Sequence, residues 1–564
     1  MPQLRNIVLA AVCALAVCAP ARPADSPEKD ADAEVERALA RIRPEAIRAH
    51  MSFLADDLLE GRGTGSRGYD LAAKYVAARF EALGLAPAGT GGGYLQPVPF
   101  LRSATVAAKC SFTVIRDGRD GRNGESTELK YGEDYVLTSG ILSQTDVEVT
   151  APLVFAGFGV SAPELGYDDY AGVDVKGKIA VVLSGAPATF PSDQRAYYSV
   201  TAFKVDTALA HGAVAVLGVL TPADARRLPW ESVVRARKSP EHQWLTAEGV
   251  AYRGRPQARG FAILNRKAAE DLFAAAPHSL DDVFKSSESG HPRSFALPVQ
   301  AHIHTVSERE RVASPNVAGL LRGSDPLLRD EVVVLTAHLD HLGIGEPIAG
   351  DAIYTGAYDN ASGVASLLEM ANAFASLPTP PRRSVLFLAV AGEEQGLQGS
   401  EYFVHNPTVP GDKIVADVNV DMFMMLHPLR DVIAFGAEHS SLGEITAQAA
   451  RRLGLAVSPD PFPEEVVFIR SDQFPFIRAG IPSLFLNAGI QSDEPGGGGP
   501  AAMKWLQTTY HHPDDDMRQT FDFAAGAKFV QLNFLVGYLA AQADAAPRWK
   551  PGDFFGVKHT VPTP

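Results

Sequence analysis

The residues of this sequence best suited to chemistry are two adjacent glutamates, Glu393 and Glu394, which follow the apolar run SVLFLAV at residues 384–390. A short apolar run rich in β-branched and aromatic residues predicts a buried strand. Adjacent residues in the turn after a strand diverge, so one carboxylate can bind a metal ion while its neighbour accepts a proton from water. The pair therefore indicates a hydrolytic site that separates a ligand from a base.

Further imidazole and carboxylate side chains stand near the ends of other expected strands or in polar loops. The run EVVVLTAHLDH ends with His338 and Asp340, which lie two positions apart and so on one side of an extended chain. GAYDNASG holds Asp359, VADVNVDM ends near Asp421, and YHHPDDD contains His511. Each position alone favours an ordinary structural role, such as a helix N-cap. Their joint occurrence at successive ends of one sheet favours a shared site.

These residue types limit the metal that such a site can hold. Imidazole and carboxylate without thiolate suit zinc, or manganese and cobalt in its place, and suit copper or an iron–sulfur cluster poorly. Five ligands exceed the needs of one open catalytic ion. Two divalent ions about 3.5–4 Å apart, bridged by a carboxylate, use all five ligands and leave room for a water molecule.

A mixed, largely parallel sheet flanked by helices must position these side chains. From Val312 onward, short apolar runs such as IPSLFLNAG alternate with helical stretches such as SGVASLLEMANAFASL. In open α/β sheets, ligands bind at the carboxyl edge of the strands. The predicted fold class is therefore α/β, with a smaller β-rich α/β unit inserted before this region.

The length of 564 residues predicts several units rather than one core. The expected division is a signal peptide at 1–24, an N-terminal part of the main domain at 25–145, an inserted unit at 146–297, the main domain at 298–548 and a C-terminal tail at 549–564. The formal net charge is −15, and no basic run interrupts it, which argues against nucleic acid as a partner.

The N-terminus has the layout of a secretory signal peptide. Arg5 precedes the apolar run IVLAAVCALAVCAP, and small residues up to Ala24 supply cleavage sites. We expect a periplasmic or secreted protein with no stable membrane insertion after cleavage. A lipoprotein anchor at Cys18 is the alternative, which Val17 disfavours because such sites want a small residue there. Cys110 would then remain alone and form no internal disulfide.

The motifs AHLDHLG, GAYDNASG, AGEEQGLQGS, NVDM and YHHPDDD, in this order, resemble those of the M28 family of dizinc metallopeptidases, the bacterial leucine aminopeptidase group. The segment LADDLLEGRGTGSRGYDLAAKYVAARFEALGL is similar to the N-terminal part of exported members. GFGVSAPELGYDDYAGVDVKGKIAVVL resembles a protease-associated (PA) domain inserted into the peptidase fold. The resemblance implies a zinc aminopeptidase that removes N-terminal residues from peptide substrates with two Zn²⁺ ions per chain.

The resemblance also implies a role for each matching residue. The implied ligands are His338 and Asp421 for one ion, Glu394 and His511 for the other, and Asp359 as the bridge. Glu393 is the implied general base.

The same resemblance implies further features of the site. Asp340 would orient His338, and Tyr510 would donate a hydrogen bond to the oxyanion. The peptide bond between Asp359 and Asn360 is expected to be cis, as in relatives. His341 receives no ligand role, and we expect it to support the site or the fold.

Two alternatives to the aminopeptidase remain open. A glutaminyl cyclase has the same fold with one zinc ion, and a receptor-like relative retains both units without metals. The full ligand set beside Glu393 disfavours the receptor, and it disfavours the cyclase less strongly. The sequence also leaves open the preferred N-terminal residue, dipeptidase or carboxypeptidase action, the physiological metal and the oligomeric state.

Overall fold

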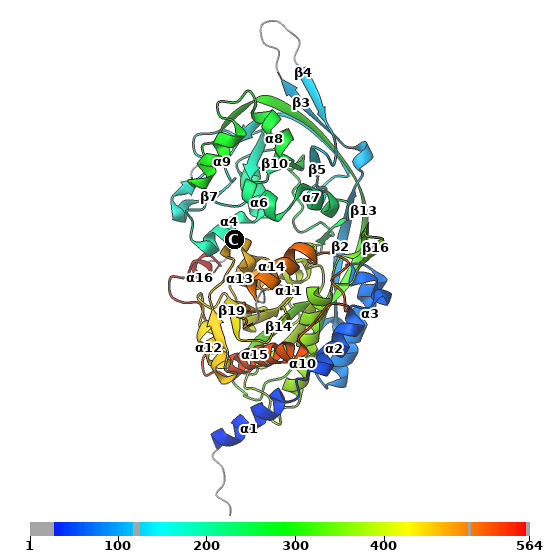
Figure 1. Ribbon diagram of the computed structural model, residues 1–564, viewed down its shortest axis with the longest axis vertical. Helices are drawn as coiled ribbons and strands as arrows, with labels where there is room; N and C mark the ends of the chain where they lie inside the picture. The colour runs from blue at the N-terminus through cyan, green and yellow to red at the C-terminus, as the bar shows by residue number, and fades with distance from the viewer. Residues whose placement is uncertain (1–26, 117–124, 291, 494–497, 560–564) are drawn as a thin grey trace, which may run out of the picture.

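The computed structural model describes residues 27–116, 125–290, 292–493 and 498–559. Two bodies lie one above the other along the long axis of the molecule, each built on its own part of a β-sheet (Figure 1). The upper body contains most of residues 111–306, and the lower body contains the strands from residue 332 onward. Strand β13 (Phe295–Leu321) belongs to both. The expected signal peptide lies outside the described residues.

The lower sheet is parallel at its centre and antiparallel towards the β13 side. From edge to edge its strands are β20 (Ala456–Ser458), β19 (Asp431–Phe435), β21 (Ser483–Ala488), β18 (Ile414–Val420), β14 (Val332–His338), β17 (Ser384–Val390), β13, β2 (Leu95–Thr105) and β11 (Glu241–Trp244), and β1 (Ala86–Pro87) also pairs with β13. Strands β17, β14, β18 and β21 are mutually parallel, so their carboxyl ends share one edge. The predicted α/β fold class is confirmed.

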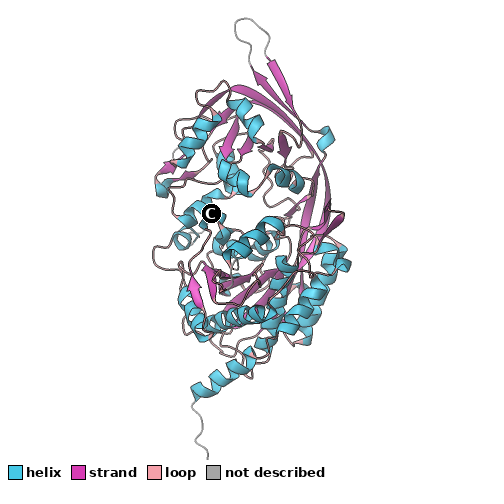
Figure 2. Cartoon of the chain, in the orientation of Figure 1, coloured by secondary structure: helices cyan, strands magenta, loops and turns pink. Residues whose placement is uncertain are grey.

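Helices cover both faces of the lower sheet (Figure 2), which is why its central strands are mostly apolar. Val333 and Leu335 of β14 face one core, while Val332 and Val334 face the other. The first face is covered by α2 (Pro44–Leu54), α3 (Arg67–Ala82), α10 (Gly363–Ala375), α12 (Leu442–Arg452) and α15 (Phe523–Gln542), and the second by α11 (Gln398–His405) and α13 (Gln473–Arg478). Helix α1 (Pro27–Leu39) extends from the base (Figure 1). Among the described helices, α15 alone is long and apolar enough to span a membrane, and 67% of its most apolar window is buried.

The upper sheet combines four parallel strands with antiparallel ones. Its order is β5 (Tyr135–Leu137), β12 (Phe261–Leu264), β10 (Ala215–Val219), β9 (Ile179–Leu183), β6 (Asp146–Phe155), β13, β3 (Ser111–Arg116) and β4 (Glu125–Leu129). Helices α8 (Arg266–Phe273) and α9 (Leu280–Glu288) pack on one face and α5 (Thr201–Ala210) on the other. The upper body also contains α4 (Ser192–Ser199), α6 (Pro222–Arg227), α7 (Trp230–Ala236) and the small hairpin of β7 (Ser161–Ala162) with β8 (Tyr167–Asp168). A second small hairpin, of β15 (Gly343–Ile348) with β16 (Asp351–Tyr354), packs against the turn that precedes α3 in the lower body.

The boundaries between the two bodies differ from those expected from the sequence. Strands β3, β4 and β5 pair within the upper sheet, so the expected boundary at residue 146 falls inside that sheet. Strand β11 lies within the expected insert but pairs with β2 of the lower sheet, where Trp244 joins the lower core. The chain therefore crosses between the bodies more often than a single insertion requires.

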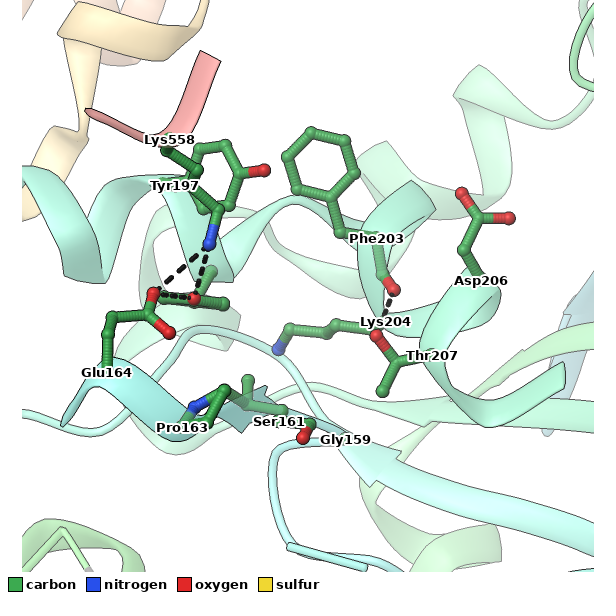
Figure 3. A pocket seen from close by; sticks show the side chains of 12 residues that line it. Gly159, Ser161, Pro163, Glu164, Tyr197, Phe203, Lys204, Asp206, Thr207 and Lys558 are labelled. Atoms are coloured by element: carbon green, nitrogen blue, oxygen red, sulfur yellow. Dashed lines mark hydrogen bonds and ion pairs between the residues drawn. The ribbon is translucent and has the colours of Figure 1, made fainter. Parts of the chain in front are cut away.

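The C-terminal segment is packed rather than a tail as far as the structure describes it. Helix α16 (Phe554–His559) lies at the seam between the two bodies, on the side opposite β13 (Figure 1). Phe555 is fully buried, and the Lys558 amine lies 3.1 Å from Glu164 Oε1 of the upper body (Figure 3). Because this segment carries several aromatic side chains, the free energy gained by burying them outweighs the conformational entropy lost on packing.

Candidate metal centre

Three neighbouring parallel strands end at the same place in the lower sheet. Strand β14 ends at His338, β17 is followed within four residues by Glu394, and β18 is followed directly by Asp421. The turn before α10 brings Asp359, and the segment after α14 (Gly499–Thr508) brings His511. All five residues expected as ligands thus meet at the carboxyl edge.

On one side of this cluster, His338 faces two carboxylates. Its Nε2 atom lies 3.1 Å from Asp421 Oδ1 and 3.3 Å from Asp359 Oδ1. The His338 ring is 1% exposed. One imidazole nitrogen and two carboxylate oxygens therefore converge within the reach of a single ion.

On the other side, the second oxygen of Asp359 faces a different group. Asp359 Oδ2 lies 3.3 Å from His511 Nε2, which is itself 3.1 Å from Glu394 Oε2. Asp359 therefore presents one oxygen to each side, which is the geometry a bridging carboxylate needs. Its peptide bond to Asn360 is cis, so the expectation for that bond is confirmed.

A third imidazole, His341, also lies against this second group. Its Nδ1 atom is 2.6 Å from Glu394 Oε1 and 3.7 Å from Asp359 Oδ2, and the ring is buried. His341 was not expected to be a ligand, although its position three residues after His338 at a strand end was a usable signal. A side chain at Gly356 would collide with the His341 ring, since an added Cβ would lie 2.5 Å from its Cγ.

Comparison with known proteins identifies the region that carries this cluster. Residues 316–532 match the family model described as Peptidase family M28. They form a peptidase family M28 domain. The matched span begins in β13, ends in α15 and contains every residue of the cluster described above.

Relatives and solved structures are consistent with this M28 domain. A probable zinc metalloprotease of Pyrenophora teres f. teres (strain 0-1) is 27% identical over 285 residues, which cover 45% of this chain and 57% of the relative. A probable zinc metalloprotease of Pyricularia oryzae is 42% identical over 88 residues, covering 15% of this chain and 16% of the relative. The match to the Pyrenophora protein thus covers little more than half of that protein's length. An aminopeptidase from Aneurinibacillus sp. strain AM-1 shares the fold, with a TM-score of 0.52 at 18% identity, covering 90% of this chain and 96% of that one.

Within the M28 domain, Asp340 holds the chain rather than the imidazole. The Asp340 carboxylate accepts hydrogen bonds from the Glu393 N–H and the Thr64 hydroxyl, both at 3.1 Å. Its Oδ1 atom is 3.9 Å from His338 Nδ1, beyond hydrogen-bond range, and the Asp340 main-chain oxygen lies 3.1 Å from that nitrogen instead. Asp340 therefore contacts the His338 ring through its main-chain oxygen, while its carboxylate accepts hydrogen bonds from two other donors.

The Tyr510 ring lies directly beside the M28 cluster. It stacks on the His511 ring with centroids 3.8 Å apart, and its hydroxyl faces the Arg470 guanidinium. Burial raises the pKa of Tyr510 well above its usual range, so the phenol stays protonated and remains a hydrogen-bond donor.

The two adjacent glutamates occupy opposite electrostatic environments. Burial raises the pKa of Glu393 well above its usual range, and the nearby Asp421 and Glu394 carboxylates add to this effect. Burial and Asp359 act in the same direction on Glu394, but the imidazoles of His511 and His341 outweigh them and lower the pKa of Glu394 to about 2. Paired groups whose environments separate their pKa values are the usual sign of divided acid–base roles.

A buried arginine that sequence reasoning missed holds the loops of the M28 centre together. Arg62 comes from the glycine-rich turn between α2 and α3 and is 1% exposed. Its guanidinium donates to main-chain oxygens of Leu339 at 3.0 Å, Thr355 at 2.6 Å and Gly356 at 3.0 Å. These bonds tie the loop after His338 to the loop before Asp359. The turn therefore supports the site and does more than connect two helices.

Asp515 supports the same loop from the other side. Its carboxylate accepts hydrogen bonds from the main-chain N–H groups of Tyr358 at 2.9 Å and Asp359 at 3.0 Å. Asp515 is fully buried. The segment YHHPDDD thus supplies both His511 and the carboxylate that fixes the shared aspartate.

Proposed function

We propose that this chain is a zinc metallopeptidase that removes N-terminal residues from peptides by adding water to the peptide bond. The observation that carries the proposal is the sharing of Asp359, whose two oxygens face two separate groups of donors. The M28 domain and the names of its relatives support a metallopeptidase. The more specific proposal of aminopeptidase action is prompted by the Aneurinibacillus aminopeptidase, which has the same fold.

The donors of the site fit zinc. They are imidazole nitrogens and carboxylate oxygens, a set that zinc accepts readily in catalytic sites. We propose His338 and Asp421 for one ion, Glu394 and His511 for a second, and Asp359 for both. The donor atoms of each group lie within 3.3 Å of a neighbour in that group.

Bound zinc ions supply Lewis acidity, which makes a nearby water molecule more acidic and polarises a substrate carbonyl. We assign to Glu393 the transfer of the proton, which it accepts from the attacking water and delivers to the departing amine. Asp340 fixes the turn that carries this base through the Glu393 N–H. Tyr510 is the proposed donor to the oxyanion that forms on the substrate carbonyl.

The upper body is proposed to be a PA-like unit that shapes access and performs no chemistry. The cluster at the carboxyl edge draws all its expected ligands and its expected base from residues 338–511, which lie in the M28 domain. The upper body therefore acts on which peptides reach the edge rather than on bond cleavage.

Export is a separate part of the proposal and rests on the N-terminal sequence. An apolar run after Arg5 with small residues up to Ala24 supports a cleaved signal peptide and a periplasmic or secreted protein. N-terminal sequencing of the protein recovered from periplasm and medium tests it. A mature N-terminus near residue 25 is the expected result, and an intact Met1 in the cytoplasm contradicts it.

Zinc content and substrate choice together test the catalytic proposal. We expect two zinc ions per purified chain by mass spectrometry of metals, hydrolysis of leucyl-p-nitroanilide, and no hydrolysis of its N-acetylated form. The acetylated substrate is the matched control, because it differs only in the free amine. One zinc ion with cyclisation of glutaminyl peptides would instead indicate the glutaminyl cyclase, and absence of bound zinc would indicate a receptor-like protein.

A further inference from the structure

A second group of potential metal ligands lies at the seam between the two bodies, outside the M28 centre. Asp193 comes from α4 of the upper body, and Glu438 and His439 follow β19 of the lower body. One ligand atom from each of these three residues lies within 4.8 Å of the others. We call Asp193, Glu438, His439 and the adjacent Asp553 the seam cluster.

The imidazole of the seam cluster is held in a fixed orientation. His439 Nδ1 lies 2.6 Å from Asp553 Oδ2, and the ring stacks on Phe468 with centroids 5.2 Å apart. Phe555 packs edge-on against the same ring at 5.0 Å. A carboxylate on one imidazole nitrogen is the arrangement that orients metal-binding histidines and fixes their tautomer.

The other nitrogen of this imidazole points at carboxylates. His439 is 7% exposed, and its Nε2 atom makes no hydrogen bond within the part of the chain that the structure describes. Nε2 lies 3.2 Å from Asp193 Oδ2 and 4.0 Å from Glu438 Oε1. A cavity of about 220 Å³ lined by Asp193, Glu438 and Phe468 adjoins the group and can hold water.

The charges of the seam cluster do not balance without a cation. Three carboxylates, those of Asp193, Glu438 and Asp553, face one imidazole, and none of the three pairs with a lysine or arginine among the described residues. Even an imidazolium at His439 would leave negative charge in excess, because three carboxylates face this one ring.

We propose that Asp193, Glu438 and His439 bind one divalent cation that links the upper body to the lower body, with Asp553 orienting the imidazole. The cation binds Nε2 of His439, and water from the adjoining cavity completes its coordination. One imidazole and two carboxylates without thiolate suit Zn²⁺ or Mn²⁺. Because the cluster lies near α16 and far around the molecule from β13, the ion fastens the bodies on the side where no shared strand joins them (Figure 1).

Zinc counts per chain test this site independently of the M28 centre. Wild type, His439→Gln, Asp193→Asn and the control Glu444→Gln are saturated with Zn²⁺, passed through a desalting column and analysed for bound metal. We expect both seam variants to retain one ion fewer than wild type and control. The difference does not depend on how many ions the M28 centre binds, so failure of the two-zinc proposal leaves this comparison intact. Glu444 is an exposed carboxylate of α12 close in sequence to the cluster.

Two further measurements separate a metal site from a simple ion pair. Asp553→Asn is expected to weaken the extra ion by about 10–100-fold, as loss of an orienting carboxylate usually does. Excess Zn²⁺ should raise the Tm of wild type more than that of Asp193→Asn, because binding stabilises the folded state. Equal ion counts in wild type and both seam variants would overturn the proposal and leave an imidazolium held between two aspartates. If His439→Gln does not fold, Asp193→Asn still gives this comparison, since Asp193 is partly exposed.

Discussion

The two bodies bury ionisable side chains in different ways. In the upper body, the Asp169 carboxylate accepts hydrogen bonds from the main-chain N–H groups of Phe158 at 2.9 Å and Val160 at 3.0 Å and from the Tyr167 hydroxyl at 2.7 Å. The Lys204 amine donates to the main-chain oxygen of Leu183 at 2.8 Å. Asp169 and Lys204 are thus satisfied by neighbouring groups of the upper body.

In the lower body, the buried groups of the M28 centre face one another instead. His338 Nε2, Asp359 and Asp421 meet on one side, and His511 Nε2, Glu394 and Asp359 meet on the other. Burial alone therefore does not mark a functional charge, whereas donor atoms turned towards a common point do.

The largest expected effect comes from the base of the M28 centre. Glu393→Gln should lower kcat by about 10²–10⁴-fold, because an amide cannot accept the proton of the attacking water. Zinc content should stay at the wild-type value, since Glu393 is not an expected ligand. Steady-state kinetics on leucyl-p-nitroanilide and metal analysis measure both. Glu394→Gln is the matched control and should lose zinc as well as activity; the reverse pattern would exchange the roles of the two glutamates.

A buried charge of the upper body should behave in the opposite manner. Asp169→Ala removes one acceptor from three donors and should cost about 2–4 kcal/mol of unfolding free energy. The kcat of the surviving folded protein on a small aminoacyl substrate should remain close to wild type. Urea denaturation and kinetics check these outcomes, with the neighbouring exposed Asp168→Ala as control. A large loss of kcat in folded protein would break the contrast between the bodies.

His341 tests whether an imidazole of the M28 centre is a metal ligand or only supports one. Its Nδ1 atom, 2.6 Å from Glu394 Oε1, leaves Oε2 free to face His511. His341→Ala should weaken the ion on the Glu394 side by about 10–100-fold, as loss of an orienting partner usually does. His341→Asn, whose amide can donate from a similar position, should restore most of the affinity. Calorimetric zinc titration measures this, and the more exposed neighbour His512→Ala serves as control. Equal losses in the Asn and Ala variants would make His341 a ligand rather than a support.

The smallest expected effect concerns a buried carboxylate of the lower body that lies outside the metal cluster. Asp417 is fully buried on β18 and accepts a hydrogen bond from the Thr336 hydroxyl, and burial raises its pKa well above the usual range. The Asp417 carboxyl group therefore keeps its proton in the folded state at pH values where the unfolded chain, with a pKa of about 3.9, has lost it. The free energy of unfolding consequently falls as the pH rises from about 3.9 to the folded pKa.

Asp417→Asn should remove that contribution, because an amide does not ionise. The stability of the variant relative to wild type should increase from pH 5 to pH 8, by about 1.4 kcal/mol for each pH unit over which Asp417 is protonated in the folded state only. Urea denaturation at both pH values measures the difference. Exposed Asp412→Asn is the control and should show the wild-type slope. An unchanged slope in Asp417→Asn would place the titration on another group.

Much of the lower body could be predicted from the sequence because its signals are local. The runs VVVLTAH and SVLFLAV are seven-residue buried strands, and a buried parallel strand must be apolar on both faces. Their ends carry His338 and Glu394, so the ligands could be placed on one edge without knowing any contact. The residue types then limited the metal.

The features that sequence reasoning missed depend on partners far along the chain. Arg62 donates to Leu339, 277 positions away, and nothing near Arg62 in the sequence signals that bond. The four residues of β11 carry no alternating apolar pattern, so its pairing with β2 follows only from the assembled sheets. His341 was underestimated for a similar reason, since its role depends on where Glu394 lies.

Strand β13 determines how this protein could exchange parts with others. A unit that starts and ends in loops can be moved as a cassette, but the upper body has no such ends. A cut at residues 146 and 297 would strip β11 from the edge of β2 and divide β6 from β13, which it pairs with over residues 295–306. Transfer of the upper body without loss of either sheet requires β2, β11 and β13 to move with it. The unit that recombination could transfer intact is therefore larger than the upper body alone.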